Sequence, residues 1–594
     1  MLDERKPRAL PALLLLLAAL PAIFTGISIL LYGVDTPLWD EWLIGGYLNQ
    51  FAQGTLSFHS LFEQQNEYRQ FFPNLIFVAL GWLTNWDVRS WMVLSFLLAG
   101  MVSYNIYHLG KWSLGDNPSR AAGIYLVANL IIFSPVQHEN WLQGQQLVYF
   151  LPIACFTASL LVASATDLRI GTRFTLCAIA AIISSFSSAN GMLCWGLLLP
   201  ALAWSSSRDE LWRKRWWIVA WVAGLVLTLV FYFHDFRSPP QHDPLAWTQV
   251  NPLRNVLYFL GILGRPLAPG RLLVAAPLGF VFISIYVWSC LRFWKLARIS
   301  TSQALRLLCW LMLGAYSVLT AALITIGRVS QDPERGLAVV RYTTYSLYLP
   351  VALLYLIPII LEKGSKELRV FNFRFSTRRL LALLGVALVL IHLPIYLLGI
   401  RQMSSFRALS LQSKACALFV NVLQDECLTE RVYPDIETLK RKINPADRLG
   451  LIRPGLIKSD RVQDIQSLQT QGQNKYGAFQ SLIQLEADQY VASGWANLPE
   501  RGEPADVVLL AYEQAGGPPI IFVIAPTNIE RDIVSALFRR GIYGDSRWSK
   551  SFSLGGINPD RAKLTAWGFD AYTGKAYKLE GEHVFQKSTG YKRK

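Results

Sequence analysis

Eleven apolar stretches constrain this chain more than any other feature of its sequence. A helix needs roughly 20 apolar residues to cross the hydrocarbon core of a bilayer, and somewhat fewer where the protein thins the bilayer. The first stretch is too long for a signal peptide and lacks a clear cleavage site, so we interpret it as an anchor. The sequence therefore predicts a polytopic α-helical membrane protein with about 11 transmembrane helices. The stretches lie at 10–31, 90–109, 121–136, 147–165, 174–189, 192–205, 216–234, 271–291, 307–326, 342–361 and 380–400.

The composition excludes the common soluble classes. Hydrophobic residues make up 53% of the 594 residues and charged residues only 16%, well below the usual share of about a quarter. Disordered, collagen-like and disulfide-scaffold proteins do not have this composition. The formal net charge of +16 would point to nucleic acid in a soluble chain, but the basic cytoplasmic loops of a membrane protein also produce it. We therefore expect no nucleic-acid partner.

One further apolar stretch, 71–86, decides the predicted topology. If this stretch does not cross the membrane, every strongly basic loop falls on one side. If it crosses, the basic loop 206–215 moves to the outer side, against the positive-inside rule. We therefore predict a cytoplasmic N-terminus and an extracytoplasmic C-terminus. The predicted outer loops are 32–89, 137–146, 190–191, 235–270, 327–341 and the chain after about 401.

The C-terminal part has a different pattern. Residues 401–485 are mixed and polar, with amphipathic helical patterns, and we interpret them as an extracytoplasmic linker region. Residues 486–594 contain short alternating runs separated by Gly, Pro and Asp, which predict a small extracytoplasmic β-sandwich. A helix over 528–540 interrupts the runs, with Thr527 and Glu530 at capping-box spacing.

The tryptophans of this β-rich domain allow two interpretations. Trp495, Trp548 and Trp567 would stack on sugars if the domain bound glycans, or would be buried if the domain only capped the membrane part. The structural interpretation is favoured, because buried tryptophan is ordinary in small sandwiches.

The cysteines divide into two groups. Cys416 and Cys427 both lie outside and close in sequence, so a disulfide is favoured over two unpaired thiols. No metal-ligand spacing of Cys or His and no phosphate-binding glycine loop occurs, which gives no support to soluble nucleotide chemistry. The remaining cysteines fall in predicted spans and read as small apolar residues: Cys155, Cys177, Cys194, Cys290 and Cys309.

An acidic pair follows the first span. Asp40 and Glu41 stand between Trp39 and Trp42, an aromatic pair suited to the headgroup region. Partial burial and like charge would suit one carboxylate to act as a general base. The alternative is a solvated acidic turn after a helix, and taken alone the pair favours that alternative.

The wider pattern resembles the GT-C superfamily of membrane glycosyltransferases. The carrying features are the outward first helix, Asp40 and Glu41, an amphipathic helix ending near Gly54, and the element NEYRQFFPNLIF. The resemblance implies a GT-C-like transmembrane domain over 1–400, with the acidic motif in the outer loop 32–89. It also implies a polyprenyl-phosphate-linked sugar as donor and Asp40, helped by Glu41, as catalytic base.

The next outer loop, SPVQHENWLQGQQLVYFLP, offers a second acid and several amides. GT-C enzymes often carry an acidic residue here, more often Asp, and this chain has Glu139. Glu139 would orient the acceptor or hold a divalent cation, Mg²⁺ or Mn²⁺, a cofactor that the resemblance leaves open. His138, Asn140 and Gln143 suit sugar hydroxyls, which need directed donors and acceptors. Helix capping and hydration of the interface are the structural alternative.

Arginines on the outer side form the third element. Arg328 and Arg341 bracket an outer loop that also contains Arg335, and Arg69 lies in the first outer loop. Arginine binds phosphate oxygens with two donors at once and stabilises a leaving phosphate. The resemblance likewise places a basic residue near the donor phosphate. Snorkelling to lipid headgroups is the alternative, but arginine on the outer face is disfavoured by topology.

The loop 235–270 is a long loop between two spans. Its proline pairs predict an irregular segment, a candidate lid over the acceptor site. His234 and His242 have no partners that would make them metal ligands, so we interpret them as surface residues.

These features together predict an inverting GT-C-like glycosyltransferase of the bacterial inner membrane. The expected partners are a polyprenyl-phosphate-linked sugar, an envelope glycan, lipid or protein as acceptor, and membrane lipids. A flippase of lipid-linked sugars and a non-catalytic scaffold for polysaccharide assembly are the alternatives. The nearly charge-free helices and the lack of an evident internal repeat argue against transport.

Overall fold

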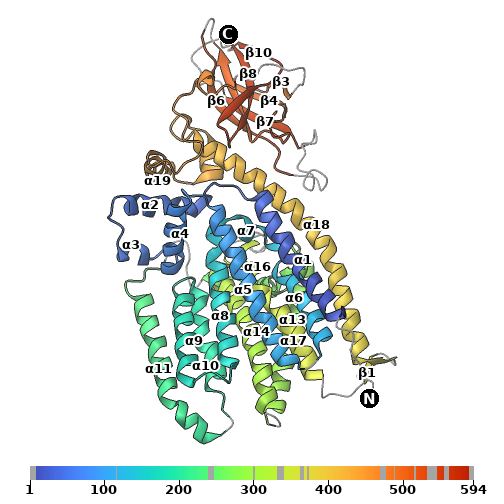
Figure 1. Ribbon diagram of the computed structural model, residues 1–594. Coiled ribbons are helices and arrows are strands. Elements are labelled where there is room, and N and C mark those ends of the chain that lie inside the picture. The colour runs from blue at the N-terminus through green and yellow to red at the C-terminus, as the bar shows by residue number, and fades with distance from the viewer. Residues whose placement is uncertain are drawn as a thin grey trace. The chain divides into compact units, whose positions relative to one another are not determined.

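A computed structural model describes most of the chain. The described residues are 9–115, 117–205, 207–238, 246–298, 301–330, 340–361, 367–370, 373–467, 476–486, 488–513, 517–530, 545–553 and 561–586. They divide into two compact units (Figure 1). Unit 1 comprises 1–31, 57–76 and 91–399, and unit 2 comprises 32–56, 77–90 and 400–594.

Unit 1 is a bundle of helices that run largely side by side (Figure 1). Helix α18, Thr377–Leu418, begins in this unit, after a short hairpin of β1 (Glu367–Val370) and β2 (Phe373–Ser376). The other helices are α1 (Ala9–Tyr32), α3 (Phe58–Phe62), α4 (Phe71–Leu83), α5 (Arg89–Leu114), α6 (Pro118–Ile132), α7 (His138–Leu142), α8 (Leu147–Ser164), α9 (Ile170–Ser185), α10 (Leu193–Ala203), α11 (Arg208–Phe233), α12 (Pro252–Gly264), α13 (Leu272–Ala297), α14 (Thr301–Arg328), α16 (Thr343–Ser346) and α17 (Tyr348–Leu361).

The polytopic helical prediction is confirmed, although not the count. Among the described residues, 9 helical segments are long and apolar enough to cross a membrane. The predicted spans 174–189 and 192–205 are found as the shorter helices α9 and α10, so their crossing stays a prediction. Helix α4 has 13 residues and is therefore about 20 Å long, shorter than a hydrocarbon core of about 30 Å. Because α9 and α10 are also short, length does not decide whether 71–86 crosses, and this stays a prediction.

Burial separates central from peripheral helices. In the most apolar stretch of the span Val340–Leu361, 83% of the residues are buried. In that of Arg208–Phe233, only 17% are buried. Trp310 of α14 stacks on Tyr355 of α17 with ring centroids 3.9 Å apart, inside this central group. Lipid tails are as apolar as leucine, so hydropathy alone cannot distinguish a central helix from a lipid-facing one.

The loop 235–270 is not wholly irregular, which corrects the prediction. It contains α12, whose start carries ordinary helix signals: the Asn251 side chain accepts the Leu253 N–H at 2.9 Å, and Pro252 is the first helical residue. Helix α12 packs closely on α13. A Cβ atom at Gly279 would overlap the Leu260 carbonyl, and one at Gly264 would overlap the Ala275 carbonyl.

We expect Gly279→Ala to destabilise the protein by about 1–3 kcal/mol, because the new methyl group meets backbone that cannot move aside. Gly123→Ala in α6 is the matched control, since no atom lies within 4 Å of its Cβ position. Helix propensity makes the control neutral or slightly stabilising. The midpoint of thermal unfolding in detergent checks both variants, and equal midpoints would contradict the packing argument.

Unit 2 contains short helices and a β-sandwich. Helix α18 continues through the predicted linker region to Leu418, and α19 follows at Ile436–Arg448. The Asp435 carboxylate caps α19 by accepting the N–H groups of Glu437 and Thr438. Near the start of the unit, α2 (Ile44–Ala52) follows the one-turn helix η1 (Trp39–Leu43).

The β-sandwich prediction is confirmed. One antiparallel sheet has the order β10-β8-β5-β6, with β9 also paired to β8, and the other has the order β3-β4-β7. Residues from both sheets form one buried core, which contains Trp548. Trp567 is also buried, as the structural interpretation of the tryptophans predicts, whereas Trp495 is only half-buried. The strands are β3 (Gly477–Gln484), β4 (Gln489–Ala496), β5 (Val507–Glu513), β6 (Ile520–Pro526), β7 (Arg547–Ser553), β8 (Arg561–Asp570), β9 (Lys575–Lys578) and β10 (His583–Gln586).

Two sequence predictions in this domain have different outcomes. Strand β3 begins before the predicted boundary at 486 and carries a register shift between Phe479 and Ser481, which breaks the alternating pattern. Most of the predicted helix 528–540 lies outside the described residues. The Thr527 hydroxyl donates to the Ala505 carbonyl at 2.9 Å, a contact within the sandwich.

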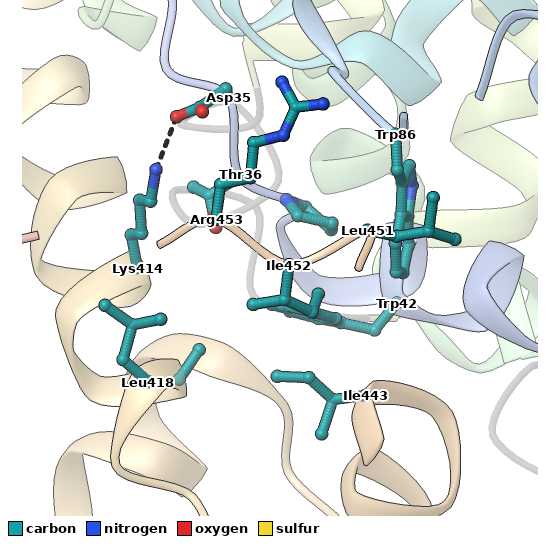
Figure 2. Close-up of a pocket in the computed structure, with 12 residues that line it drawn as sticks. Asp35, Thr36, Trp42, Trp86, Lys414, Leu418, Ile443, Leu451, Ile452 and Arg453 are labelled. Carbon is teal, nitrogen blue, oxygen red and sulfur yellow. Dashed lines mark hydrogen bonds and ion pairs between the residues drawn. The ribbon is translucent and has the colours of Figure 1, made fainter. Parts of the chain in front are cut away.

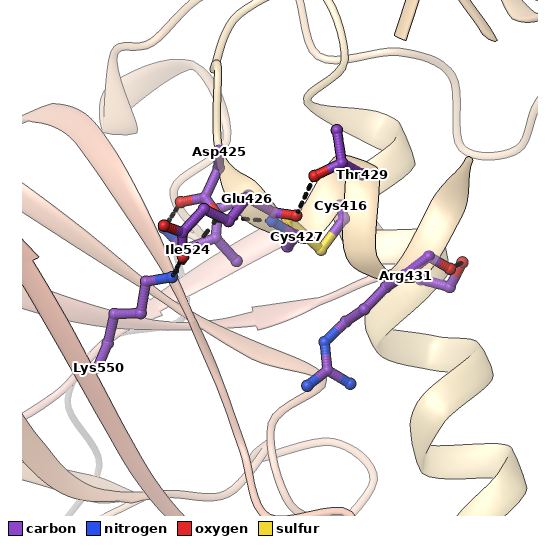
Figure 3. The surroundings of a disulfide bond; sticks show 9 residues. Cys416, Asp425, Glu426, Cys427, Thr429, Arg431, Ile524 and Lys550 are labelled. Carbon is purple, nitrogen blue, oxygen red and sulfur yellow. Dashed lines mark hydrogen bonds and ion pairs between the residues drawn. A yellow bond between two sulfur atoms is a disulfide. The ribbon is translucent and has the colours of Figure 1, made fainter. Parts of the chain in front are cut away.

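The predicted disulfide between Cys416 and Cys427 is present (Figure 3). It joins the end of α18 to the segment that follows it. Asp425 supports this segment by accepting the N–H groups of Cys427 and Ile524, each at 2.9 Å. The disulfide therefore ties to α18 the segment that Asp425 connects to the sandwich strand β6.

Replacing both cysteines, Cys416→Ser with Cys427→Ser, should cost about 2–4 kcal/mol, because an open loop leaves the unfolded chain more freedom. The two residues are 11 apart in sequence, so the closed loop is short. Thermal unfolding of the wild type and of the double variant, each measured with and without reductant, tests this prediction. Reductant should lower the midpoint of the wild type and leave the double variant unchanged.

Candidate functional site

The acidic turn in unit 2 separates its two carboxylates. Glu41 is buried and its Oε2 accepts the Leu38 N–H at 2.7 Å, so this carboxylate closes the turn η1. Asp40 is exposed. Burial raises the pKa of Tyr433, and the charge of nearby Asp40 raises it further. Of the predicted pair, Asp40 is the carboxylate that a substrate can reach.

Tryptophans anchor this turn. Trp42 is buried and meets Trp86 edge to face, with ring centroids 5.8 Å apart. Gly45 lies against the Trp86 ring, where a Cβ atom would come within 2.7 Å. Trp39, which begins the turn at φ 51°, is 42% exposed. The sequence GG after this turn thus lets α2 approach the Trp86 ring.

A small pocket adjoins the turn within unit 2 (Figure 2). Its lining combines the indoles of Trp42 and Trp86 with the cationic groups of Lys414 and Arg453. Lys414 pairs with Asp35 at 2.6 Å, as the dashed line in Figure 2 shows. The pocket therefore offers aromatic and charged groups next to the acidic turn.

Unit 1 gathers three arginines that are far apart in sequence. Arg328 ends α14, Arg341 lies in the one-turn helix η7 (Val340–Tyr342), and Arg265 begins the one-turn helix η6 (Arg265–Leu267) after α12. All three are close enough to Tyr258 for their charges to act on it. Burial lowers the pKa of Arg265 to about 10, so this side chain stays charged at neutral pH.

Tyrosines surround these arginines. Tyr342 lies within electrostatic range of Arg328 and Arg341, and its hydroxyl accepts the Arg328 Nε–H at 3.2 Å. Tyr68 and Tyr149 lie in the same group. Burial raises the pKa of Tyr68, so its phenol stays protonated. The cluster thus combines three cations with neutral hydroxyl groups, a set that suits phosphate oxygens.

Glu67, in the first of the predicted outer loops, meets the arginine cluster. Its two carboxylate oxygens accept from the two Nη atoms of Arg328 at 2.6 and 3.2 Å. The two side chains are 16% (Arg328) and 25% (Glu67) exposed, so the ion pair lies at the edge of solvent.

Helix α7 places the second predicted acid in the same cluster. Glu139 is half-buried, and Arg341 and Arg265 are the charges that act on it. Asn140 Nδ2 donates to the Arg341 carbonyl at 2.9 Å and to Thr344 Oγ1 at 2.5 Å. The Asn140 amide therefore holds the backbone that carries Arg341.

The other predicted residues have more local contacts. His138 is buried, and Gln143 accepts from Gln146 Nε2 at 2.7 Å. Arg69 is buried and donates to three backbone carbonyls, those of Phe62, Tyr232 and His234. These bonds show that Arg69 has a structural role, since it connects backbone segments that are far apart in sequence. Its binding of phosphate stays a prediction.

The structure thus brings Glu139, Arg328 and Arg341 into one cluster of unit 1, and Asp40 and Glu41 into one turn of unit 2. Arg335, His242 and Asp243 lie outside the described residues. Among the described residues, no group of three or more His, Cys, Asp or Glu is arranged to hold a metal ion.

The sequence prediction did not include Arg265 and Glu67 among the residues of the site. Each of them nevertheless has a feature in the sequence that could have identified it. Arg265 lies in a predicted outer loop, where arginine is disfavoured by topology, and Glu67 belongs to the NEYRQFFP element.

No protein-family model matches the chain, and neither does any curated protein. Among solved structures, the chain is similar to the crystal structure of ArnT from Cupriavidus metallidurans bound to undecaprenyl phosphate. The two are 16% identical, with a TM-score of 0.36, over 74% of this chain and 75% of that one. A TM-score this low establishes neither a shared fold nor a shared activity.

Proposed function

We propose that this protein transfers a sugar from a polyprenyl-phosphate donor to a cell-envelope acceptor on the outer face of the bacterial inner membrane. The observation that carries the proposal is the cluster of Arg265, Arg328 and Arg341 among tyrosines. Such a cluster is suited to bind a lipid phosphate and to stabilise it as it leaves. In this proposal the N-terminus is cytoplasmic and the C-terminal domain is outside.

The proposed reaction inverts the anomeric centre. An acceptor hydroxyl attacks the anomeric carbon while the bond from that carbon to the phosphate oxygen breaks. The polyprenyl phosphate leaves with the bonding electrons, and the arginines stabilise its charge. Asp40 takes the proton of the hydroxyl as general base. Its exposure supports this role over Glu41, which is buried in the turn.

Helix α7 would contact the sugar or the acceptor. Glu139 orients the acceptor or a divalent cation in this proposal, with His138 and Gln143 nearby in sequence. Asn140 Oδ1 is buried and has no hydrogen-bond partner among the described residues. A buried acceptor of this kind requires a partner, and a sugar hydroxyl would supply one.

The test is transfer of label from a panel of radiolabelled polyprenyl-phosphate sugars by the purified protein, with envelope extract as acceptor. We expect one donor to yield a labelled product and nucleotide sugars to yield none. Addition of EDTA, Mg²⁺ or Mn²⁺ in the same assay tests the divalent cation. Lack of product with every donor would contradict the proposal. Movement of an intact lipid-linked sugar across reconstituted vesicles would then favour a flippase, and the absence of both activities a scaffold.

A further inference from the structure

Glu67 stands at the tip of a tight turn in the first outer loop. The N–H groups of Gln65 and Tyr68 each donate to the carbonyl of the other residue, at 2.8 and 2.9 Å. Asn66, between them, has φ 50°, a conformation that asparagine tolerates better than most residues. The turn therefore presents the Glu67 side chain outward from a narrow loop.

The base of this turn is fixed to the end of α11. Arg69 Nε donates to the Tyr232 carbonyl at 2.7 Å, and the Tyr232 hydroxyl donates to the Glu67 carbonyl at 2.8 Å. The Gln64 amide donates to the Arg237 carbonyl at 2.6 Å and accepts the Arg237 N–H at 3.0 Å. These bonds connect the turn to α11 and to the residues that follow it, whereas the Glu67 carboxylate reaches across to α14.

The carboxylate of Glu67 occupies the part of Arg328 that would bind phosphate. A guanidinium presents a planar pair of N–H donors that fits one carboxylate or one phosphate. Both Nη atoms of Arg328 already donate to Glu67. A phosphate bound in the same way must therefore displace Glu67.

A phosphate has an advantage in this exchange. Glu67 carries one negative charge and is bonded to Arg328, whereas Arg341 and Arg265 belong to the same cluster. The donor phosphate is a diester with a single negative charge, but it can interact with all three cations, and the phosphate monoester released by transfer can carry two negative charges. The partial exposure of the Glu67–Arg328 pair also weakens it by solvent screening.

We propose that the Glu67 side chain acts as a lid on Arg328, and that the donor phosphate replaces its carboxylate when the donor binds. The inference rests on the proposed function. Glu67 holds Arg328 in place while the site is empty and must be released before the phosphate enters. Only molecules in which Glu67 has released Arg328 can bind the donor. The apparent donor affinity is therefore lower than the intrinsic affinity, in proportion to the fraction of molecules in that state.

The test measures binding of farnesyl phosphate to the purified full-length protein. We expect Glu67→Gln to bind about 3–10-fold more tightly than the wild type, because the competing charge is gone. Glu67→Ala should change affinity in the same direction. Glu63→Gln is the matched control: Glu63 is an exposed acid of the same loop, and its loss should leave affinity unchanged. Thermal unfolding establishes that each variant is folded.

A double variant tests whether the effect of Glu67 on binding depends on Arg328. In an Arg328→Gln background, binding should be weaker than in the wild type, and Glu67→Gln should no longer increase it. Unchanged or weaker binding by Glu67→Gln and Glu67→Ala, with wild-type binding intact, would overturn the lid, as would tighter binding that persists in the Arg328→Gln background. Absence of binding by the wild type and all variants would instead overturn the proposed function.

Discussion

Asp40→Asn is expected to lower kcat for sugar transfer by about 10²–10⁴-fold, the range that positioned general bases contribute. Asparagine keeps the size and polarity of the side chain but cannot take the proton of the acceptor hydroxyl. Because Asp40 is exposed, the substitution should leave the thermal unfolding midpoint unchanged. Binding of farnesyl phosphate should also be unchanged, since the arginine cluster carries that contact in the proposed function.

Glu41→Gln is the matched variant for this prediction. The Glu41 carboxylate is buried and accepts the Leu38 N–H, and a glutamine carbonyl oxygen can accept the same bond. We expect this variant to keep most of the transfer activity. Loss of transfer in Glu41→Gln together with activity in Asp40→Asn would show that the base is Glu41. Full activity in both variants would exclude the acidic turn from catalysis.

Arg501→Ala is expected to have the largest effect on stability, about 3–5 kcal/mol, as when one partner of a buried ion pair is removed. Arg501 contacts Glu503 at 2.7 Å, Asp506 at 3.0 Å and Asp570 at 2.9 Å. Burial raises the pKa of Asp506, and the charge of Arg501 opposes that shift. Without Arg501, Asp506 and Asp570 lose the cation that they share. Glu503 keeps a second ion pair, with Arg407.

Hydrogen exchange of the backbone in β5 and β8 measures this effect, because Asp506 and Asp570 adjoin these paired strands. Arg561→Ala is the control: Arg561 is an exposed arginine at the start of β8, so its loss should change exchange little. Equal exchange in the two variants would show that the buried network does not stabilise the sandwich.

The sequence determined the elements whose signal is local. The length and apolarity of a segment such as 147–165 predicted α8 almost to the residue, because a spanning helix needs that number of apolar residues. Alternation over QYVASGWA predicted β4, because successive side chains of a strand face opposite sides. The disulfide followed from two neighbouring cysteines in a segment that the sequence predicts to be extracytoplasmic.

Three elements, α12, β3 and the end of α18, differ from the prediction although their local sequence contains the relevant features. Helix α12 begins with Asn251 and Pro252, a cap and a first-turn residue that the proline-rich context of 235–270 obscured. The whole of β3 was missed because its register shift interrupts alternation. Helix α18 runs on to Leu418 because the amphipathic pattern after 400 follows the apolar one without a helix-breaking residue.

The sequence alone thus determined the helical membrane part, the C-terminal β-sandwich and the residue types available for chemistry. Only the tertiary structure decided which of those residues meet. Glu67 and Arg328 are 261 residues apart, and Arg265 joins Arg328 and Arg341 from a third helix end. Hydropathy reports how much a residue avoids water and not which neighbour it contacts, because apolar packing is non-directional. The arginine cluster therefore depends on how the helix ends pack, which no local pattern records.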